Sequence, residues 1–127
     1  MKKIFLSICI LTIIGFTSCK KEVKTIKKSQ VNITTTTNFG VRGNCGMCKK
    51  TIEKAAKSVE GVANAVWNIK KKNIEVSFDS IQTDLTAIHT AIAKSGYDTE
   101  KTIRNKEVYK QLPACCQYET EMEMNLE

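Results

Sequence analysis

The sequence lacks the residue sets on which most enzymes depend. Its 127 residues include one histidine, His89, and one proline, Pro113. A serine–histidine–acid set, a paired carboxylate arrangement and a phosphate-binding loop are all missing, so neither hydrolysis nor phosphoryl transfer is indicated. We therefore expect a protein that is not an enzyme.

The sequence also lacks an apolar run long enough to cross a bilayer. Its longest run, residues 4–16, has 13 residues, whereas a transmembrane helix needs about 20. Lys2 and Lys3 precede this run, which is the order of parts in a secretory signal peptide. Export is therefore predicted in preference to a permanent membrane span.

A cysteine follows this run where a bacterial lipoprotein would be cleaved. Residues 16–19, Phe-Thr-Ser-Cys, resemble a lipobox, in which cleavage precedes the cysteine and a lipid is attached to it. We expect residues 1–18 to be a lipoprotein signal peptide and Cys19 to carry the lipid; an ordinary cleaved signal with a cysteine nearby is the alternative. Lipidation predicts a cell-envelope protein, anchored to a membrane on its periplasmic or outer side.

The positive charge of the chain is concentrated near the expected anchor. The formal net charge is +7, and removal of residues 1–18 leaves 18 basic and 13 acidic residues, a net charge of +5. Five lysines lie in residues 19–33, the expected lipid anchor site and basic linker, where each could attract anionic headgroups by about 1 kcal/mol. A solvated spacer is the simpler interpretation. Basic residues do not alternate with aromatic ones, so nucleic acid is not an expected partner.

Periodic apolar positions predict an α+β domain in residues 34–104. They indicate, in order, a strand that ends at Gly43, a helix that starts on Cys-x-x-Cys and ends at Gly61, a hairpin of strands 63–69 and 74–78, a helix within 80–96 and a last strand, 97–103. This is the order of a ferredoxin-like βαββαβ sandwich, with two helices on one face of a four-stranded antiparallel sheet. Residues 105–127 follow as a C-terminal extension with a Cys-Cys pair and an acidic tail that is expected to be disordered.

The same patterns give structural roles to two single residues. The apolar stripe of the second helix consists of Ile81, Leu85, Ile88 and Ile92, with Ser80 or Thr83 as its cap. His89 lies off this stripe, so we expect it at the surface or at the boundary of the core. Trp67 shares an alternating strand face with Ala65 and Ile69, which favours a packing role.

Cys45 and Cys48 are separated by two residues at the start of an amphipathic, lysine-rich helix. This spacing suits a metal clasp, a redox pair or a structural disulfide. Thiolates bind metal, and a helix N-terminus with nearby cations such as Lys49 and Lys50 favours the thiolate form. We favour metal binding. A redox or disulfide role stays open, because export exposes thiols to oxidation.

The chain around this pair resembles the heavy-metal-associated domain family. The features that carry the resemblance are the Cys-x-x-Cys between a strand and a helix, Ile52-Glu53-Lys54-Ala55, Gly61-Val62 and Gly96-Tyr97. The family includes copper chaperones, metal-binding modules of copper-pumping ATPases and a periplasmic mercury-binding protein. The resemblance covers residues 34–104 and implies that Cys45 and Cys48 are the metal ligands. Where the family has Gly-Met-x-Cys, this chain has the shorter Gly43-Asn44-Cys45, with its methionine at Met47 between the ligands.

Soft thiolate ligands predict Cu(I) as the bound ion, with Zn(II) or Hg(II) as alternatives. Sulfur favours Cu(I) over hard cations, and Cu(I) accepts two ligands, whereas zinc normally takes four. We expect the chain to capture the ion and hand it to a thiol-containing partner protein, as a metal chaperone or scavenger.

Two other functions remain open for the same cysteines. One is thiol–disulfide exchange or redox sensing, although a thioredoxin-like site usually has a cis-proline opposite the motif, and Pro113 lies far downstream. The other is a surface-tethered interaction module stabilised by disulfides. Replacing Cys45 and Cys48 by serine separates this module from a metal-binding protein. It should abolish metal uptake without unfolding a metal-binding domain, whereas loss of a structural disulfide should sharply lower the melting temperature.

Three further sulfur-containing side chains could join the metal site. Cys115 and Cys116 follow Pro113 in the extension, which could fold back to complete a zinc site, shield a copper ion or pass it on by ligand exchange. Otherwise they are unrelated or mutually oxidised thiols, because sequence adjacency says nothing about their distance from Cys45. Met47 could be a weak third ligand, but we favour a hydrophobic plug that points inward.

Overall fold

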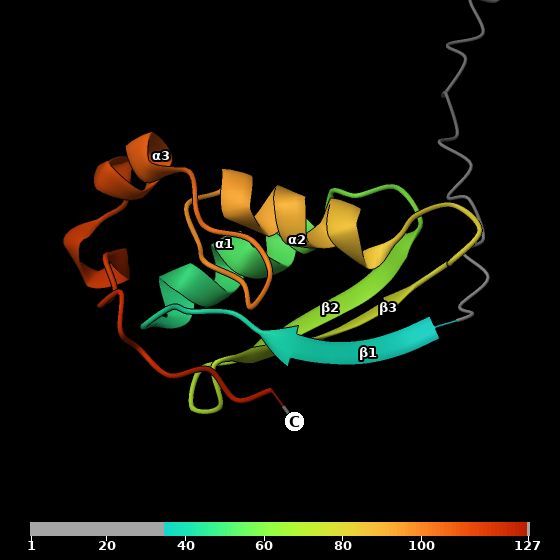
Figure 1. The fold of residues 1–127 in the computed structure, drawn as a ribbon, viewed down its shortest axis with the longest axis horizontal. Coiled ribbons are helices and arrows are strands. Elements are labelled where there is room, and N and C mark those ends of the chain that lie inside the picture. The colour runs from blue at the N-terminus through green and yellow to red at the C-terminus, as the bar shows by residue number, and fades with distance from the viewer. Residues whose placement is uncertain (1–34, 127) are drawn as a thin grey trace, which may run out of the picture.

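The computed structural model describes residues 35–126, and a hydrophobic core closes within them (Figure 1). The expected signal peptide, the expected lipidation site at Cys19 and the expected basic linker of residues 19–33 lie outside the described residues. The elements are β1 (Thr35–Gly40), α1 (Gly46–Lys57), β2 (Val62–Asn68), β3 (Asn73–Phe78), α2 (Leu85–Lys94), α3 (Lys106–Gln111) and a 3-10 turn (Ala114–Cys116). Between residues 35 and 126, no helix combines the length and apolar character needed to span a membrane.

Three strands form an antiparallel sheet in the order β1-β3-β2. In the central strand, Ile74 lies opposite Phe39 of β1 and Trp67 of β2. All three side chains are buried, because residues paired across neighbouring strands point to the same face of the sheet. Helices α1 and α2 contact each other on one face of the sheet (Figure 1). The predicted α+β, ferredoxin-like arrangement is confirmed.

The predicted count of four strands is not confirmed. Residues 97–103, expected as the last strand, form a single isolated bridge, between Val41 and Thr99. The backbone N–H of Thr99 donates to the carbonyl of Thr102 at 2.9 Å. The chain therefore turns immediately after the bridge, and a continuous ladder with β1 does not develop.

Helix α2 begins later than its apolar stripe predicts. Its N-cap is Asp84, whose carboxylate accepts a hydrogen bond from the backbone N–H of Ala87 at 2.9 Å. Ile81, expected on the buried stripe, precedes the helix and is 88% exposed. The aspartate cap, rather than the earlier serine or threonine, decides where the helix starts, because it satisfies an otherwise unpaired N–H of the first turn.

The prediction that His89 lies at the surface or at the boundary of the core is wrong. His89 is 1% exposed, and its ring centroid lies 4.0 Å from that of Phe39. Leu85, Ile88 and Ile92 flank it on α2, so the buried face of this helix is wider than the narrow stripe assumed from the sequence. Neither ring nitrogen has a hydrogen-bond partner among residues 35–126, and burial lowers the pKa of His89.

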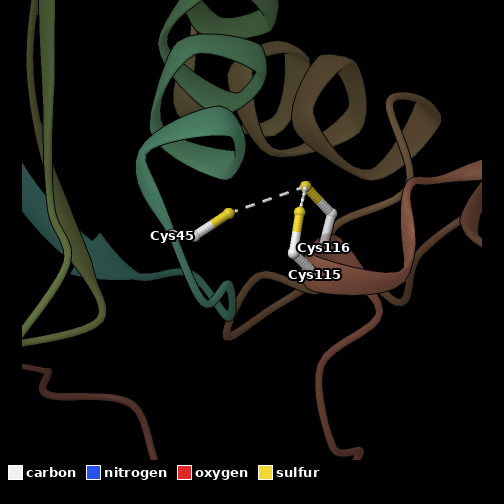
Figure 2. Close-up of side chains that lie close together, drawn as sticks. All are labelled: Cys45, Cys115 and Cys116. Atoms are coloured by element: carbon white, nitrogen blue, oxygen red, sulfur yellow. Dashed lines mark hydrogen bonds between the residues drawn. The ribbon is translucent and has the colours of Figure 1, made fainter.

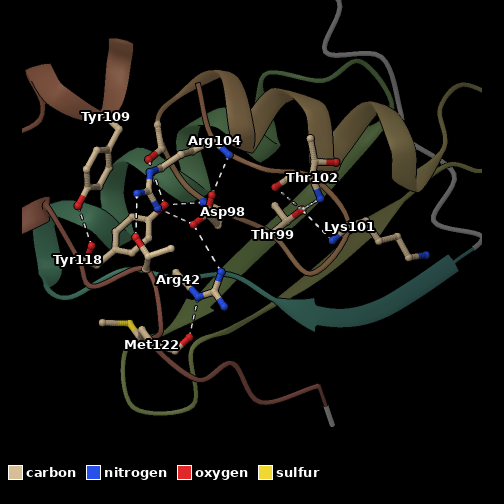
Figure 3. Close-up of polar contacts among 11 residues, drawn as sticks. Arg42, Asp98, Thr99, Lys101, Thr102, Arg104, Tyr109, Tyr118 and Met122 are labelled. Carbon is tan, nitrogen blue, oxygen red and sulfur yellow. Dashed lines mark hydrogen bonds and ion pairs between the residues drawn. The ribbon is translucent and has the colours of Figure 1, made fainter. Parts of the chain in front are cut away.

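The acidic tail lies against the domain, and the prediction of disorder is corrected. Arg42 Nε donates to the carbonyl of Met122 at 2.6 Å (Figure 3), and the backbone N–H of Asn125 donates to the carbonyl of Lys71 at 3.0 Å. Acidic composition alone misses these contacts, because the tail is held through its backbone groups. The extension therefore returns along the domain to the turn between β2 and β3 (Figure 1).

Candidate metal centre

The Cys-x-x-Cys lies where the chain passes from β1 into α1, as predicted. Cys45 is the N-cap of α1, and its carbonyl accepts the first helical hydrogen bond, from the N–H of Lys49 at 3.0 Å. Cys48 falls in the first turn and is fully buried, whereas Cys45 is partly exposed. Because residues i and i+3 share a helix face, the two Sγ atoms lie 3.5 Å apart.

Trp67 supports this loop from below. Its indole Nε1 donates to the carbonyl of Val41 at 3.0 Å, and its ring is 1% exposed, which confirms the predicted packing role. At Gly43, a Cβ atom would lie 3.0 Å from the Trp67 ring and 3.2 Å from Cys48 Cβ. A glycine at this position therefore lets the loop that carries the cysteines pack directly against the indole.

In the structure, the Cys-Cys pair of the extension lies next to the Cys-x-x-Cys. Cys45 Sγ lies 3.8 Å from Cys116 Sγ, and Cys116 Sγ lies 3.9 Å from Cys115 Sγ (Figure 2). The sulfurs of Cys45, Cys115 and Cys116 are all within 4.8 Å of one another. The four cysteines of the described chain are free thiols, so all four could serve as metal ligands.

The thiols of this cluster differ in their ionisation. Hydrogen bonding from the backbone of Cys48, with smaller contributions from its thiol and from the backbone of Met47, lowers the pKa of Cys45 to about 7. Burial raises the pKa of Cys116 to about 12. At pH 7 about half of Cys45 is therefore thiolate whereas Cys116 is protonated, and the two sulfurs lie within hydrogen-bonding distance at 3.8 Å.

Lys49 does not support the thiolate in the way the sequence suggested. Its Nζ lies 2.5 Å from Glu53 Oε1 and 2.6 Å from the carbonyl of Trp67, so its charge is directed along α1 toward β2. Backbone N–H groups at the start of α1 supply the stabilisation instead, as expected for an anion at a helix N-terminus.

Two neighbouring side chains complete the description of the site. Met47 is 51% exposed, with its Sδ 3.8 Å from Cys115 Sγ, so the inward plug favoured from the sequence is not observed. Tyr97 is fully buried beneath the cluster, and burial raises the pKa of its hydroxyl, with the thiols of Cys116 and Cys48 adding to the effect. Tyr97 therefore remains a neutral phenol beside the sulfurs.

The residues that hold the extension in place were missed by sequence reasoning. The Tyr118 hydroxyl accepts from the backbone N–H of Asp98 at 2.7 Å, and Asp98 Oδ2 lies 2.6 Å from Arg104 Nη1 (Figure 3). The Arg104 guanidinium carbon lies 3.8 Å from the centroid of the Tyr109 ring. The signal available was a pair of tyrosines flanking the cysteine pair, but their partners lie too far away in sequence for periodicity to reveal them.

Comparisons with known proteins agree with this geometry. A family model for the heavy-metal-associated domain matches residues 44–98. Copper-transporting ATPase 2 of Rhizobium meliloti (strain 1021) is 42% identical over 62 residues, which are 48% of this chain and 7% of the ATPase. Copper chaperone CopZ of Staphylococcus aureus (strain MRSA252) is 31% identical over 55 residues, which are 43% of this chain and 81% of the chaperone. The chain thus spans less than a tenth of the ATPase but most of the chaperone.

Solved structures show the same relationship. A CopZ metallochaperone superposes with a TM-score of 0.50 at 29% identity, covering 51% of this chain and 98% of that one. Oxidized MerP from Ralstonia metallidurans CH34 superposes with a TM-score of 0.50 at 30% identity, covering 52% and 93%. The family match ends at residue 98, before the Cys-Cys pair of the extension. These matches, together with the Cys-x-x-Cys at the start of its first helix, show that the chain belongs to the heavy-metal-associated domain family.

Proposed function

We propose that this chain binds one Cu(I) ion between Cys45 and Cys48 and transfers it to a thiol-containing partner protein. The observation that carries the proposal is the pair of sulfurs 3.5 Å apart at the N-terminus of α1, one buried and one partly exposed. Two thiolates and one monovalent copper carry a net charge of −1, which the N–H groups of a helix start stabilise. Soft sulfur ligands favour Cu(I) over hard cations.

Relatives that are named for copper support the choice of ion. They include copper-transporting ATPases and copper chaperones, and the chain aligns with most of the length of a copper chaperone. Zn(II) and Hg(II) are the competing ions; Hg(II) shares the preference for few sulfur ligands, whereas zinc normally takes four.

Transfer would proceed by ligand exchange rather than by catalysis. An incoming thiolate from the partner joins the ion before one of the two cysteines leaves, so the ion is never without sulfur ligands. Cys45 is the partly exposed cysteine of the pair and has a pKa lowered to about 7, so a large fraction is thiolate near neutral pH. Cys45 is therefore positioned to receive the ion first.

The place of action forms part of the proposal. Cleavage after residue 18 and lipidation of Cys19 would tether the domain to a membrane on the periplasmic or outer side, with the basic residues 19–33 as linker. A tethered carrier meets donors and acceptors at the membrane at high effective concentration. Metabolic labelling with a fatty acid tests this, since label should disappear when Cys19 is replaced by alanine.

Anaerobic native mass spectrometry of the reduced chain, started at Lys20, tests the metal site. In the Cys115→Ser/Cys116→Ser background, which isolates the Cys-x-x-Cys, we expect one Cu(I) to survive a competing chelator. Further replacement of Cys45 and Cys48 by serine should remove it while the fluorescence of Trp67 shows that the domain remains folded. If the pair retains no copper and the protein isolates with a reversible Cys45–Cys48 disulfide, the redox function replaces this proposal.

A further inference from the structure

Two thiols distant in sequence lie beside Cys45. Cys116 Sγ lies 3.8 Å from Cys45 Sγ, and Cys115 Sγ lies 3.9 Å from Cys116 Sγ. All three sulfurs lie within 4.8 Å of one another, and Figure 2 shows them converging from α1 and from the extension. The convergence is not needed for a two-cysteine site.

The extension is anchored so that this arrangement persists. Cys116 and Tyr118 are each 1% exposed, and the Tyr118 ring stacks on Tyr97 with centroids 5.9 Å apart. The Tyr118 hydroxyl accepts from the N–H of Asp98 at 2.7 Å and donates to the carbonyl of Gly96 at 3.3 Å. These contacts fix the segment directly after the cysteine pair.

The turn that carries the pair is fixed as well. The N–H of Cys116 donates to the carbonyl of Pro113 at 2.7 Å, which closes the 3-10 turn. The hydroxyl of Tyr109 donates to the carbonyl of Tyr118 at 2.7 Å (Figure 3). The cysteine pair is thus held from both sides, and its sulfurs need little reorganisation to bind an ion.

We propose that Cys45, Cys115 and Cys116 form a second, three-thiolate site for the same soft ion, which shares Cys45 with the Cys45/Cys48 pair. This inference rests on the proposed function and adds to it two ligands, Cys115 and Cys116, that lie beyond the family match, which ends at residue 98.

The spacing of the sulfurs suits three-coordinate binding. Three sulfurs about 2.3 Å from one ion at the centre of their plane would lie about 4.0 Å apart. The Cys45–Cys116 and Cys115–Cys116 edges of the triangle, 3.8 Å and 3.9 Å, are close to this value. The site therefore needs only small side-chain movements to close around a Cu(I) ion.

The ion would pass between the two sites by exchange of ligands. As Cys116 and Cys115 each bind copper, each loses its thiol proton to solvent; as Cys48 leaves, its sulfur takes up one proton. Copper remains Cu(I) throughout, so no oxidant or reductant is required. Cys45 stays bound to the copper ion in both arrangements, because it is the ligand that the two sites share.

With this second site, the extension would compete with the partner protein for the bound copper ion. Cys116 lies 3.8 Å from Cys45 and would add its thiolate to the ion before a partner does. Copper held by three thiolates would then be released more slowly than copper held by two. The chain would then store the ion until a partner displaces the extension, which favours a scavenging role over rapid delivery.

A set of serine variants, loaded with Cu(I) and titrated with a competing chelator, separates the two sites. We expect Cys48→Ser to retain one Cu(I), bound by Cys45, Cys115 and Cys116. We expect Cys115→Ser/Cys116→Ser also to retain one Cu(I), bound by Cys45 and Cys48, with an affinity lower than that of the unmodified chain by about tenfold or more. The triple variant lacking Cys48, Cys115 and Cys116 should keep none. Ile81→Ser, a serine substitution at a position that is 88% exposed and precedes α2 outside the cysteine cluster, is the control and should behave as the unmodified chain.

The contrary outcomes are distinct. If Cys115→Ser/Cys116→Ser retains copper as well as the unmodified chain and Cys48→Ser loses it, the three-thiolate site does not exist and the proposed function stands. If Cys115→Ser/Cys116→Ser loses all copper, the pair does not bind on its own and the proposed function fails.

X-ray absorption at the copper edge provides a second measurement that does not depend on affinity. The unmodified chain should show three sulfur ligands, with the longer Cu–S distance of three-coordination, and Cys115→Ser/Cys116→Ser should show two. Two ligands in both proteins would overturn the inference even if their affinities differ.

Discussion

Cys116 Sγ lies 3.8 Å from Cys45 Sγ across a sequence separation of 71 residues. Cys45 opens the first helix of the metal-binding domain, whereas Cys116 ends a 3-10 turn in the extension. Their pKa values are shifted in opposite directions, to about 7 for Cys45 and about 12 for Cys116. Above pH 7 the metal-free protein therefore holds a Cys45 that is mostly thiolate beside a protonated Cys116.

The reactivity of Cys45 is predicted to depend on pH near neutrality. Its pKa is lowered from 9.0 to about 7, chiefly by hydrogen bonding from the backbone of Cys48, so the thiolate fraction rises as pH increases through 7. Alkylation of the reduced, metal-free chain, with Cys45 followed by peptide mass spectrometry, should reach half its maximal rate near pH 7. In denaturant the midpoint should move toward 9.0; identical midpoints in the two states would contradict the prediction.

Gly43→Ala is predicted to weaken Cu(I) retention. The new methyl group would lie 3.0 Å from the Trp67 ring and 3.2 Å from Cys48 Cβ, and so would push the loop off the indole and move the ligands. Chelator competition measures the effect. Gly46→Ala is the control, because a Cβ there meets nothing within 4 Å. Equal retention by both variants would show that the loop tolerates the methyl group.

Tyr118→Phe is predicted to destabilise the domain by about 1–3 kcal/mol, because the buried N–H of Asp98 loses its acceptor. Urea unfolding at pH 7 provides the measurement. Tyr109→Phe, which removes one hydrogen bond to the carbonyl of Tyr118 at a partly buried position, should cost less, about 0.5–1.5 kcal/mol. A larger loss for Tyr109→Phe would mean that the Tyr118 hydroxyl is not the main anchor.

His89→Leu is predicted to stabilise the domain and to remove a pH dependence. Both ring nitrogens are buried without a partner among the described residues, which costs about 1–3 kcal/mol. Burial lowers the pKa of His89 below 6.5, so below pH 6.5 the unfolded chain binds a proton that the folded chain does not. Stability should fall as pH decreases below 6.5 in the unmodified chain.

Urea unfolding at pH 5 and pH 7 checks this for both proteins. The difference in unfolding free energy between the two pH values should be smaller for His89→Leu than for the unmodified chain. An equal difference would assign the pH dependence to other groups.

Much of the fold could be predicted because its information is local. Ile52 and Ala56 at helical spacing and Ile74 and Val76 at strand spacing predict the elements in which the structure places them. The predictions failed where the local sequence allowed more than one helix start or strand end. Asp84, and not Ser80 or Thr83, is the N-cap of α2. The turn at Thr99 prevents the strand predicted for residues 97–103.

The sequence by itself determined that two thiols would stand at the start of α1, because cysteine spacing, helix period and helix start are all properties of neighbouring residues. Only the tertiary structure decided that Cys115 and Cys116 reach Cys45. That proximity depends on Tyr118 binding the backbone around Asp98 and on Arg104 pairing with the Asp98 carboxylate. Such contacts are made between segments whose separation along the chain carries no periodic signal, so packing in three dimensions alone assembles the cluster.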